Sequence, residues 1–241
     1  RDLHGKFRRQ GQMCIRDSIE TKDEISIITL DDGKANAFSF EMITSLNESL
    51  EQVPKDKGAL IIKGRDGLFS GGFDLKTLAS GDMDAIAKMV SAGYQMLHDL
   101  YTFPRPIIAL ATGHAVAMGV FVLCCADYRI GIKGDFICQA NEVRNNMDIP
   151  TQIMAIIQDR ISKKHFYSAV YHADAFDFET SKEVGYLDEI VEPDNLMARA
   201  FEKASDLATL GHPFYEKTKQ CAQKETARKV LDAIKDFNSK T

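Results

Sequence analysis

Leu68-Phe69-Ser70-Gly71-Gly72-Phe73-Asp74-Leu75 lies between a short apolar run, Ala59 to Ile62, and a segment with helical character. A continuous apolar run of this length between glycines predicts a strand that is buried on both faces. Adjacent glycines let the backbone approach a ligand closely, and Asp74 is a suitable N-cap for a following helix. The stretch therefore predicts a strand, a turn and a helix, with a backbone N–H aimed outward; by itself it also fits an ordinary tight turn.

A second stretch, Pro106 to Ile130, repeats this order. An apolar strand from Ile107 runs into the small-residue turn Ala117-Met118-Gly119, and a wholly apolar segment then continues to Asp127. This segment predicts a buried helix that begins near Gly119. Because the first N–H groups of a helix have no partner within it and carry the positive end of its dipole, we expect partial positive charge at the turn.

These two motifs, in this order, resemble the crotonase superfamily of enoyl-CoA hydratases and isomerases, from about Ile25 to the C-terminal end. The resemblance implies an α/β fold built as a spiral of ββα units with a C-terminal helical region. It also implies an oxyanion hole for a thioester enolate. One backbone N–H of that hole would come from Phe73 and the other from Met118.

The segment Asn141 to Pro150 carries the candidate catalytic residue. By itself, Glu142 fits a surface residue, but the resemblance places the superfamily's catalytic glutamate at this position. A carboxyl group in a largely apolar surround has a raised pKa, which suits proton transfer near neutral pH. Asn146 stands where the family often has glycine, and asparagine tolerates positive φ well.

The resemblance also shows that this sequence lacks one glutamate of the family's hydratases. Family hydratases generally use two glutamates, and Phe121 stands where the first one would be. A single Glu142 predicts isomerisation of 3-enoyl-CoA to 2-enoyl-CoA. Two alternatives stay open: a hydratase that uses Glu142 alone, and a non-catalytic fatty acyl-CoA binder. Arg144 and Asp148 put charge into a stretch that the family keeps apolar, so they either pair, line a polar acyl pocket or mark a lost activity.

Substrate contacts are assigned by the same resemblance. The predicted substrate-binding residues are Asn36, Ala37, Phe69, Ser70, Gly71, Gly72, Asp74, Ala117, Gly119 and Phe121. Lys34, Lys76, Lys217 and Lys219 are candidates for the CoA phosphates, although each also fits a solvated surface lysine. We expect no metal site and no separate cofactor, since coenzyme A is part of the substrate.

Composition limits the classes of function. The net charge of −5 and the pI near 5.7 argue against nucleic acid as a main partner. The five cysteines show no CxxC spacing, which suggests neither a zinc site nor a disulfide framework and fits a reducing cytoplasm. No apolar stretch reaches the roughly 18 residues that a membrane span requires.

The chain divides into three predicted parts. Residues 1–18 carry five basic and two acidic residues and no apolar period, so we expect a disordered tail, a tag or a sequence artefact. Residues 19–195 form the predicted spiral core. Residues 196–241 form the predicted helical region, which the resemblance implies covers the active site and packs between subunits of a homotrimer or a dimer of trimers.

Overall fold

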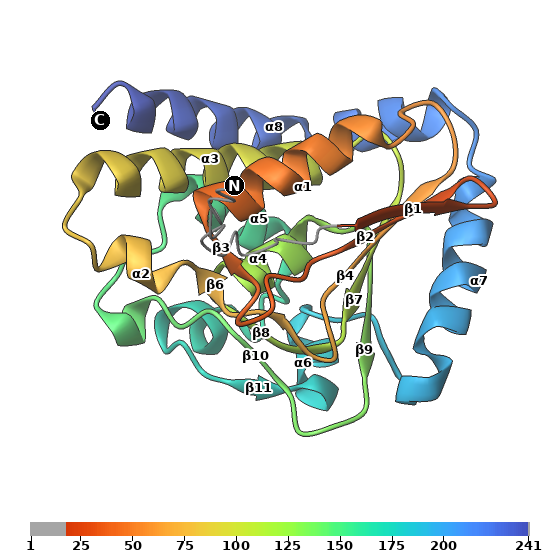
Figure 1. Ribbon diagram of the computed structural model, residues 1–241, viewed down its shortest axis with the longest axis horizontal. Coiled ribbons are helices and arrows are strands. Elements are labelled where there is room, and N and C mark those ends of the chain that lie inside the picture. Colours follow the sequence, from red (N-terminus) through yellow and green to blue (C-terminus); the bar gives the residue numbers. More distant parts are fainter. Residues whose placement is uncertain (1–17, 241) are drawn as a thin grey trace, which may run out of the picture.

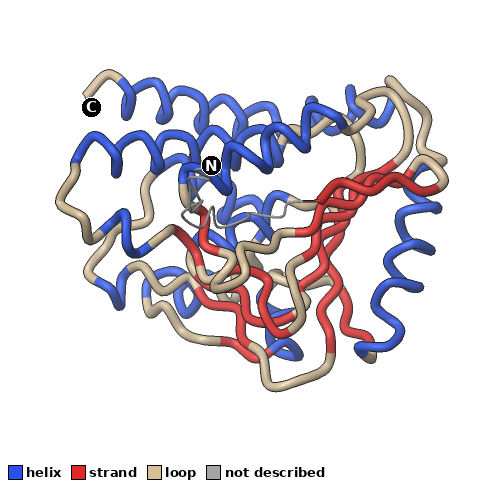
Figure 2. The backbone as a smooth tube through the Cα atoms, viewed as in Figure 1, coloured by secondary structure: helices blue, strands red, loops and turns tan. Residues whose placement is uncertain are grey.

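The structure is a computed structural model that describes residues 18–240, and it confirms the α/β class (Figures 1 and 2). Its large sheet contains, in spatial order, β1 (Ser18–Lys22), β2 (Ile25–Thr29), β4 (Ala59–Lys63), β7 (Ile107–Ala111), β9 (Tyr128–Ile132) and β12 (Glu189–Val191). A second sheet contains β11 (Phe176–Asp177), β10 (Ile137–Gln139), β8 (Gly113–Val116) and β5 (Gly67–Ser70). Two short strands, β3 (Ala37–Phe38) and β6 (Gly72–Phe73), pair in parallel.

From β4 to β10, apart from the short strand β6, successive strands alternate between the two larger sheets. β4, β7 and β9 are parallel neighbours in the large sheet, and the strands that follow them, β5, β8 and β10, are parallel neighbours in the second sheet. Helices follow each pair of strands. This arrangement confirms the predicted spiral of ββα units.

Several of the helices begin at a side-chain N-cap. The helices are α1 (Phe40–Gln52), α2 (Leu75–Leu78), α3 (Met83–Tyr101), α4 (Met118–Cys125), α5 (Thr151–Arg160), α6 (Phe178–Val184), α7 (Leu196–Ala208) and α8 (Phe214–Asn238), with short helical turns at Val143–Asn145, Tyr167–Tyr171 and Pro193–Asn195. Side-chain oxygens of Ser39, Asp74 and Asp82 accept N–H groups of the first turns of α1, α2 and α3. α4 is apolar on every side, and all of its residues are buried.

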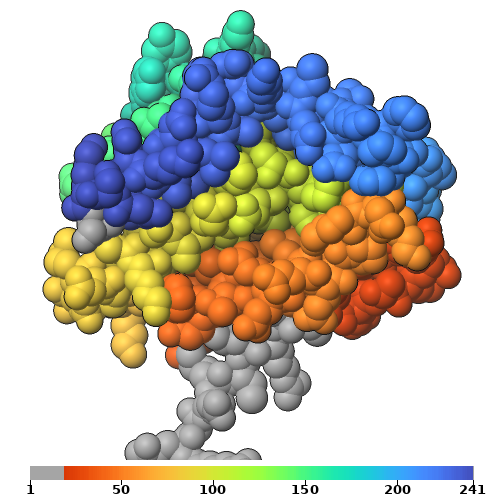
Figure 3. All heavy atoms as spheres, turned by 90° about the horizontal axis from the view of Figure 1, so that it is seen from above, coloured from red at the N-terminus to blue at the C-terminus, as the bar shows by residue number. Residues whose placement is uncertain are grey.

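Helices cover both faces of the large sheet. On one face, α7 packs Leu196 and Ala200 against Ile27, Ile61 and Ile108; α7 stands beside the strands in Figure 1. The opposite face belongs to the main core with α1, α3, α4 and α5. α8 packs on α3 and α5, and Figure 3 shows α8 lying alongside α3.

The N-terminal boundary needs one correction. Ser18 does not belong to the tail: it is the first residue of β1, an antiparallel strand that pairs Ser18 with Thr29 and Lys22 with Ile25. The main-chain pairing that β2 offers at the edge of the sheet decides this strand, and it has no strong hydrophobic pattern of its own. Residues 1–17, for which a tail is predicted, lie outside the described residues.

Among the helices described, none has the length and apolar composition needed to cross a membrane.

Candidate active site

A cavity of about 700 Å³ opens between α2, α3, α4 and the segment after β10. Of the residues predicted from the sequence, Gly71, Phe73, Ala117, Met118, Phe121 and Glu142 line it. Both motifs and the glutamate therefore meet at one cavity, although they are far apart in the chain.

Hydrogen bonds of the Asn36 and Ser70 side chains hold the first motif in place. The buried Asn36 amide donates to the carbonyl oxygens of Leu30 and Phe69, at 2.8 and 3.2 Å. The Ser70 hydroxyl donates to the carbonyl oxygen of Asn36 at 2.7 Å and accepts the N–H of Gly72 at 3.1 Å. Asn36 and Ser70 thus position the turn that leads to Phe73.

The two motifs are in direct contact, and glycine permits it. A Cβ atom added at Gly72 would lie 2.8 Å from the Ala117 Cβ and 3.5 Å from the Met118 nitrogen. In the other direction, a Cβ atom at Gly119 would lie 2.7 Å from the Ser70 carbonyl oxygen. Gly72 also has a φ of +101°, which disfavours any side chain there.

The two predicted backbone donors, Met118 and Phe73, lie on either side of this junction. Met118 is the first residue of α4, so its N–H has no partner within the helix. Directly after β6, the N–H of Asp74 donates to the carbonyl oxygen of Phe38 in β3; because N–H groups alternate along a strand, the N–H of Phe73 points away from β3. Ala117 holds the turn at φ 51° and ψ −124°, a backbone conformation that costs an alanine about 1–3 kcal/mol.

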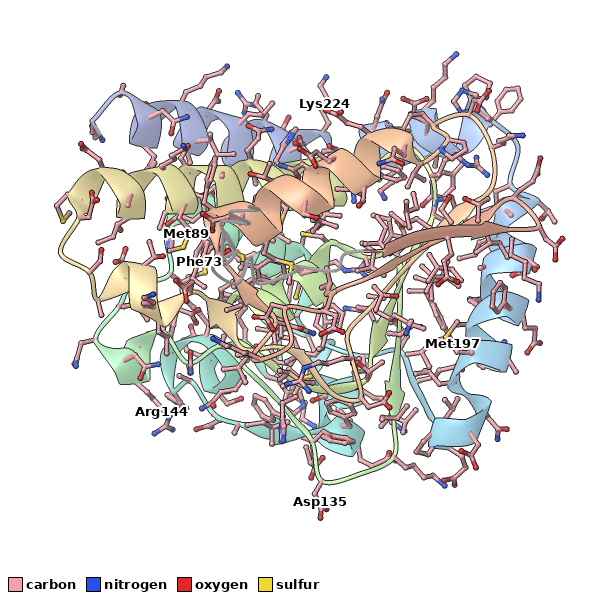
Figure 4. All side chains as sticks on the ribbon, viewed as in Figure 1. Phe73, Met89, Asp135, Arg144, Met197 and Lys224 are labelled. Carbon is pink, nitrogen blue, oxygen red and sulfur yellow. The ribbon has the colours of Figure 1, made fainter. Side chains whose placement is uncertain are left out.

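α3 approaches this junction closely at Gly93. A Cβ atom at Gly93 would lie 2.5 Å from the Phe73 ring and 3.2 Å from the end of the Met118 side chain. Figure 4 shows Phe73 in the interior beside α3. A glycine within a helix is costly relative to alanine, by about 1 kcal/mol, and here it makes room for both side chains.

Glu142 lies on the cavity wall and is buried, with 8% of its surface exposed. Its backbone oxygen accepts the N–H groups of Asn145 and Met147, and Asn146 has the left-handed φ of 57° that its residue type allows. Within residues 18–240, the Glu142 Oε2 atom has no hydrogen-bond partner. Burial raises the pKa of Glu142 from its ordinary value of 4.5 to about 7.

Three aromatic rings, those of Phe73, Tyr94 and Phe121, line the cavity with Glu142. Phe121, from α4, is 1% exposed, and Tyr94 comes from α3. The Tyr94 ring meets Phe237 of α8 edge-on, with 5.3 Å between centroids. Burial, followed by the charges of Asp148 and Glu142, raises the pKa of Tyr94 to about 12, so its phenol is neutral at physiological pH.

Arg144 and Asp148 have separate surroundings. Arg144 forms an ion pair with Asp174 at 3.0 Å and donates to the Ala173 carbonyl oxygen at 2.7 Å. Its side chain points outward in Figure 4. Asp148 is exposed but lines the cavity. Of the three predicted explanations, lining of the pocket holds for Asp148, whereas Arg144 pairs with Asp174 and not with Asp148.

Comparison with known proteins assigns this arrangement to a family. The sequence model described as "Enoyl-CoA hydratase/isomerase" matches residues 20–240. The chain belongs to this family.

Individual members of the enoyl-CoA hydratase/isomerase family are similar to this chain over different lengths. A peroxisomal enoyl-CoA delta isomerase of Arabidopsis thaliana is 28% identical over 153 residues, which cover 62% of each chain. A probable enoyl-CoA hydratase of Bacillus subtilis is 30% identical over 120 residues, 48% of this chain and 46% of that protein. The chain thus matches less than two thirds of either relative.

A solved structure extends the similarity to nearly the whole chain. The crystal structure of a probable enoyl-CoA hydratase from Mycobacterium tuberculosis has a TM-score of 0.86 and 34% sequence identity. The match covers 92% of this chain and 94% of that one. The family's spiral fold and C-terminal helices are therefore shared.

Several predicted substrate-binding residues do not line the cavity. These residues of the described chain are Asn36, Ala37, Phe69, Ser70, Gly72, Asp74 and Gly119. They build and cap the turns behind it, and their assignment to substrate binding stays a prediction.

Many of the residues that line the cavity were not predicted from the sequence. The additional lining residues are Leu75, Leu78, Ala79, Val90, Tyr94, Asn141, Asn145, Met147, Pro150 and Ile153. Val90 and Tyr94 are four residues apart on α3 and so share one helical face, a signal present in the sequence. No pattern in the sequence tells which face of α3 meets the cavity.

The four lysines that are candidates for the CoA phosphates differ in their exposure. Lys34, Lys76 and Lys217 are exposed, whereas the Lys219 side chain is 7% exposed and pairs with Asp127 at 2.9 Å. A lysine held this way is not available to a phosphate, so Lys219 is corrected to a structural residue. The homotrimer, the cytoplasmic location and the domain boundary at residue 195 stay predictions. No residue from 196 to 240 lines the cavity.

Proposed function

We propose that this chain isomerises 3-enoyl-CoA to 2-enoyl-CoA thioesters, with Glu142 as the only proton shuttle. The observation that carries this proposal is the buried Glu142 Oε2 atom, which has no partner among the described residues, on a cavity that also receives Phe73 and Met118. A base with a pKa of about 7 is suited to accept and return a proton at neutral pH.

The N–H groups of Phe73 and Met118 would stabilise the negative charge that develops on the thioester oxygen. An α-proton of a thioester is too weakly acidic to leave without such stabilisation, and each donor typically contributes about 10² to 10³ in rate. The positive end of the α4 dipole would add to the Met118 donor. The contact between Gly72 and Ala117 supports this role, because it keeps the two turns together.

The reaction would need one group for both proton transfers. The Glu142 carboxylate takes a proton from C2 of the 3-enoyl thioester, and the C–H electrons delocalise into a dienolate whose oxygen accepts both N–H groups. The protonated Glu142 then returns the proton to C4, and the double bond moves to C2–C3. No atom is gained or lost, so the step needs no co-reactant.

Phe121 favours isomerisation over hydration. It occupies the place where the family resemblance puts the first of two water-holding glutamates, and its ring cannot exchange a proton. It is fully buried against the cavity, so the ring also excludes water from that side. We therefore expect hydration of 2-enoyl-CoA to be slow or absent.

Purified full-length protein tests the proposal by absorbance with a 3-enoyl-CoA and, separately, a 2-enoyl-CoA. We expect conversion of the first and no hydration of the second. Glu142→Gln should lower turnover by about 10² to 10⁴ while acyl-CoA still binds. Glu48→Gln, an exposed position on α1, is the matched control and should retain wild-type turnover.

Three results would contradict the proposal in different ways. Full turnover by the Glu142 variant removes Glu142 from the mechanism. Hydration of the 2-enoyl thioester means that Phe121 does not prevent a water reaction. Binding without any turnover of either substrate identifies an acyl-CoA binding protein.

A further inference from the structure

A second buried polar group, the hydroxyl of Tyr186, lies behind the cavity wall. Tyr186 is fully buried, and its hydroxyl oxygen has no hydrogen-bond partner within residues 18–240. The residue is not among those that line the cavity. A buried hydroxyl without a partner lowers the stability of a fold, so a tyrosine at this position calls for a functional explanation that a phenylalanine would not.

The backbone brings Tyr186 to the strand that leads to Glu142. The Tyr186 N–H donates to the Ser181 carbonyl oxygen at 2.9 Å, and the Tyr186 ring packs on Phe176, with 6.4 Å between the centroids. Phe176 belongs to β11, where it pairs with Cys138 of β10. The chain continues from β10 into the segment that carries Glu142. Tyr186 therefore lies on the interior side of that segment.

The Tyr186 hydroxyl and the Glu142 Oε2 atom are both enclosed and both without a partner among the described residues. Glu142 lines the cavity, but Oε2 is turned away from solvent, toward the interior. Burial, followed by the neighbouring groups Cys124, Cys138 and Glu142, raises the pKa of Tyr186 well above its ordinary value of 10.0. The phenol thus keeps its proton and can act on a carboxylate only as a donor.

We infer that Tyr186 is the positioning residue for Glu142: once a bound thioester fills the cavity, the Tyr186 O–H donates to the Glu142 carboxylate, directly or through one buried water. The inference rests on the proposed function, since it concerns the base of that reaction. A bound acyl group excludes cavity water from Glu142, so the ionised carboxylate then needs a donor from the interior. Such a hydrogen bond fixes the orientation of the carboxylate and favours its charged form.

The other titratable groups that face this pair, within the described chain, do not obscure the effect. Tyr94 of α3 and Asp148 lie on the cavity side, and Cys124 of α4 and Cys138 of β10 lie on the interior side. Burial raises the pKa of Tyr94 to about 12, that of Cys124 to about 11 and that of Cys138 to about 12. These three stay neutral up to pH 9, and Asp148 is common to every variant compared.

Tyr186→Phe removes the hydroxyl and keeps the ring. We expect the midpoint of the kcat profile against pH, which reports the substrate complex, to rise by about one pH unit, whereas the midpoint for kcat/KM, which reports the free protein, stays in place. Such a shift lowers kcat about tenfold below the midpoint and leaves it nearly unchanged at pH 9. Tyr171→Phe makes the same change at an exposed position and should keep both midpoints.

A second readout needs no turnover. The full-length protein is saturated with a saturated acyl-CoA, and the infrared band of the protonated Glu142 carboxyl group, identified by its loss in Glu142→Gln, is followed against pH. Its midpoint should also rise by about one pH unit in Tyr186→Phe and stay in place in Tyr171→Phe.

The outcomes separate this inference from the proposed function. An infrared midpoint that is the same in wild type and Tyr186→Phe overturns the inference alone. An equal loss of kcat at every pH also overturns it, because a purely structural role predicts that result. Absence of turnover by the wild-type protein overturns the proposed function, and the infrared midpoint still decides whether Tyr186 donates to Glu142. Failure of every acyl-CoA to bind overturns both.

Discussion

Replacement of Glu142 by glutamine should make the protein more stable at alkaline pH and change its stability little at acid pH. Burial raises the pKa of Glu142 from 4.5 to about 7 in the folded chain. The cause is loss of hydration, since the carboxylate gains no compensating partner among the described residues. The folded state therefore holds a proton that the unfolded chain has already released.

The sign and size of the effect follow from this difference. Below pH 4.5, Glu142 is protonated in both the folded and the unfolded chain, so its ionisation does not lower the free energy of unfolding. Between pH 4.5 and about 7, only the unfolded chain releases the proton, so the free energy of unfolding of the wild type falls as pH rises. Above pH 7, the loss is complete and amounts to about 3 kcal/mol. Glutamine cannot ionise, so the Glu142 variant escapes this loss.

Urea unfolding of wild type and Glu142→Gln at pH 5 and pH 8 measures the effect. The difference between the two proteins should grow by about 2–3 kcal/mol from pH 5 to pH 8, in favour of the variant. The glutamine side chain packs in the same way at both pH values, so its contribution to stability cancels when the two differences are compared. Glu48→Gln, which makes the same chemical change at an exposed site, should stay within about 0.5 kcal/mol of wild type. A Glu142 difference that is equal at both pH values would refute the desolvation argument.

Three further changes test the same structure. The isomerisation kcat/KM should rise with pH and level off above about 7, because Glu142 must be deprotonated to act as a base; a flat profile from pH 6 to 8 contradicts this. Gly72→Ala should lower the free energy of unfolding by about 2–4 kcal/mol, because φ is +101° and the new Cβ meets another side chain at 2.8 Å. Gly211→Ala, where the nearest atom is 3.7 Å away, should change it by less than about 0.5 kcal/mol, and equal losses would exclude a steric cause. Asp188→Asn should cost about 2–3 kcal/mol in thermal or urea unfolding, because Asp188 accepts three hydrogen bonds from the buried Arg129; an unchanged Tm counts against that pair.

Local patterns made much of the fold predictable. The apolar run at Ala59 predicts a strand buried on both faces, and β4 is one. Asp74 predicts a helix start, and its side chain accepts a first-turn N–H group of α2. Asn146 has the positive φ expected of it. These features depend on a few consecutive residues, so a single sequence carries enough information to predict them.

Partners that are distant in the chain could not be predicted in this way. β1 forms because β2 offers an unpaired edge, and the residues of β1 do not show this by themselves. Asp174, the ion-pair partner of Arg144, lies 30 residues later in the chain, and no spacing rule links the two. Lys219 reads as a surface lysine until α8 brings it to Asp127.

For the site, the sequence by itself determined the identity and order of the chemical groups: two glycine-containing turns, a phenylalanine just after the second turn, and one glutamate further along the chain. The family resemblance was enough to name Phe73, Met118 and Glu142 as candidates. Only the tertiary structure decided that these residues share one cavity with Tyr94 and Asp148, and that Glu142 is buried without a partner among residues 18–240. The physical reason is that burial and contact depend on which helix faces pack together, and the α3 face that carries Tyr94 is set by its contacts with α4, α5 and α8 across the whole chain.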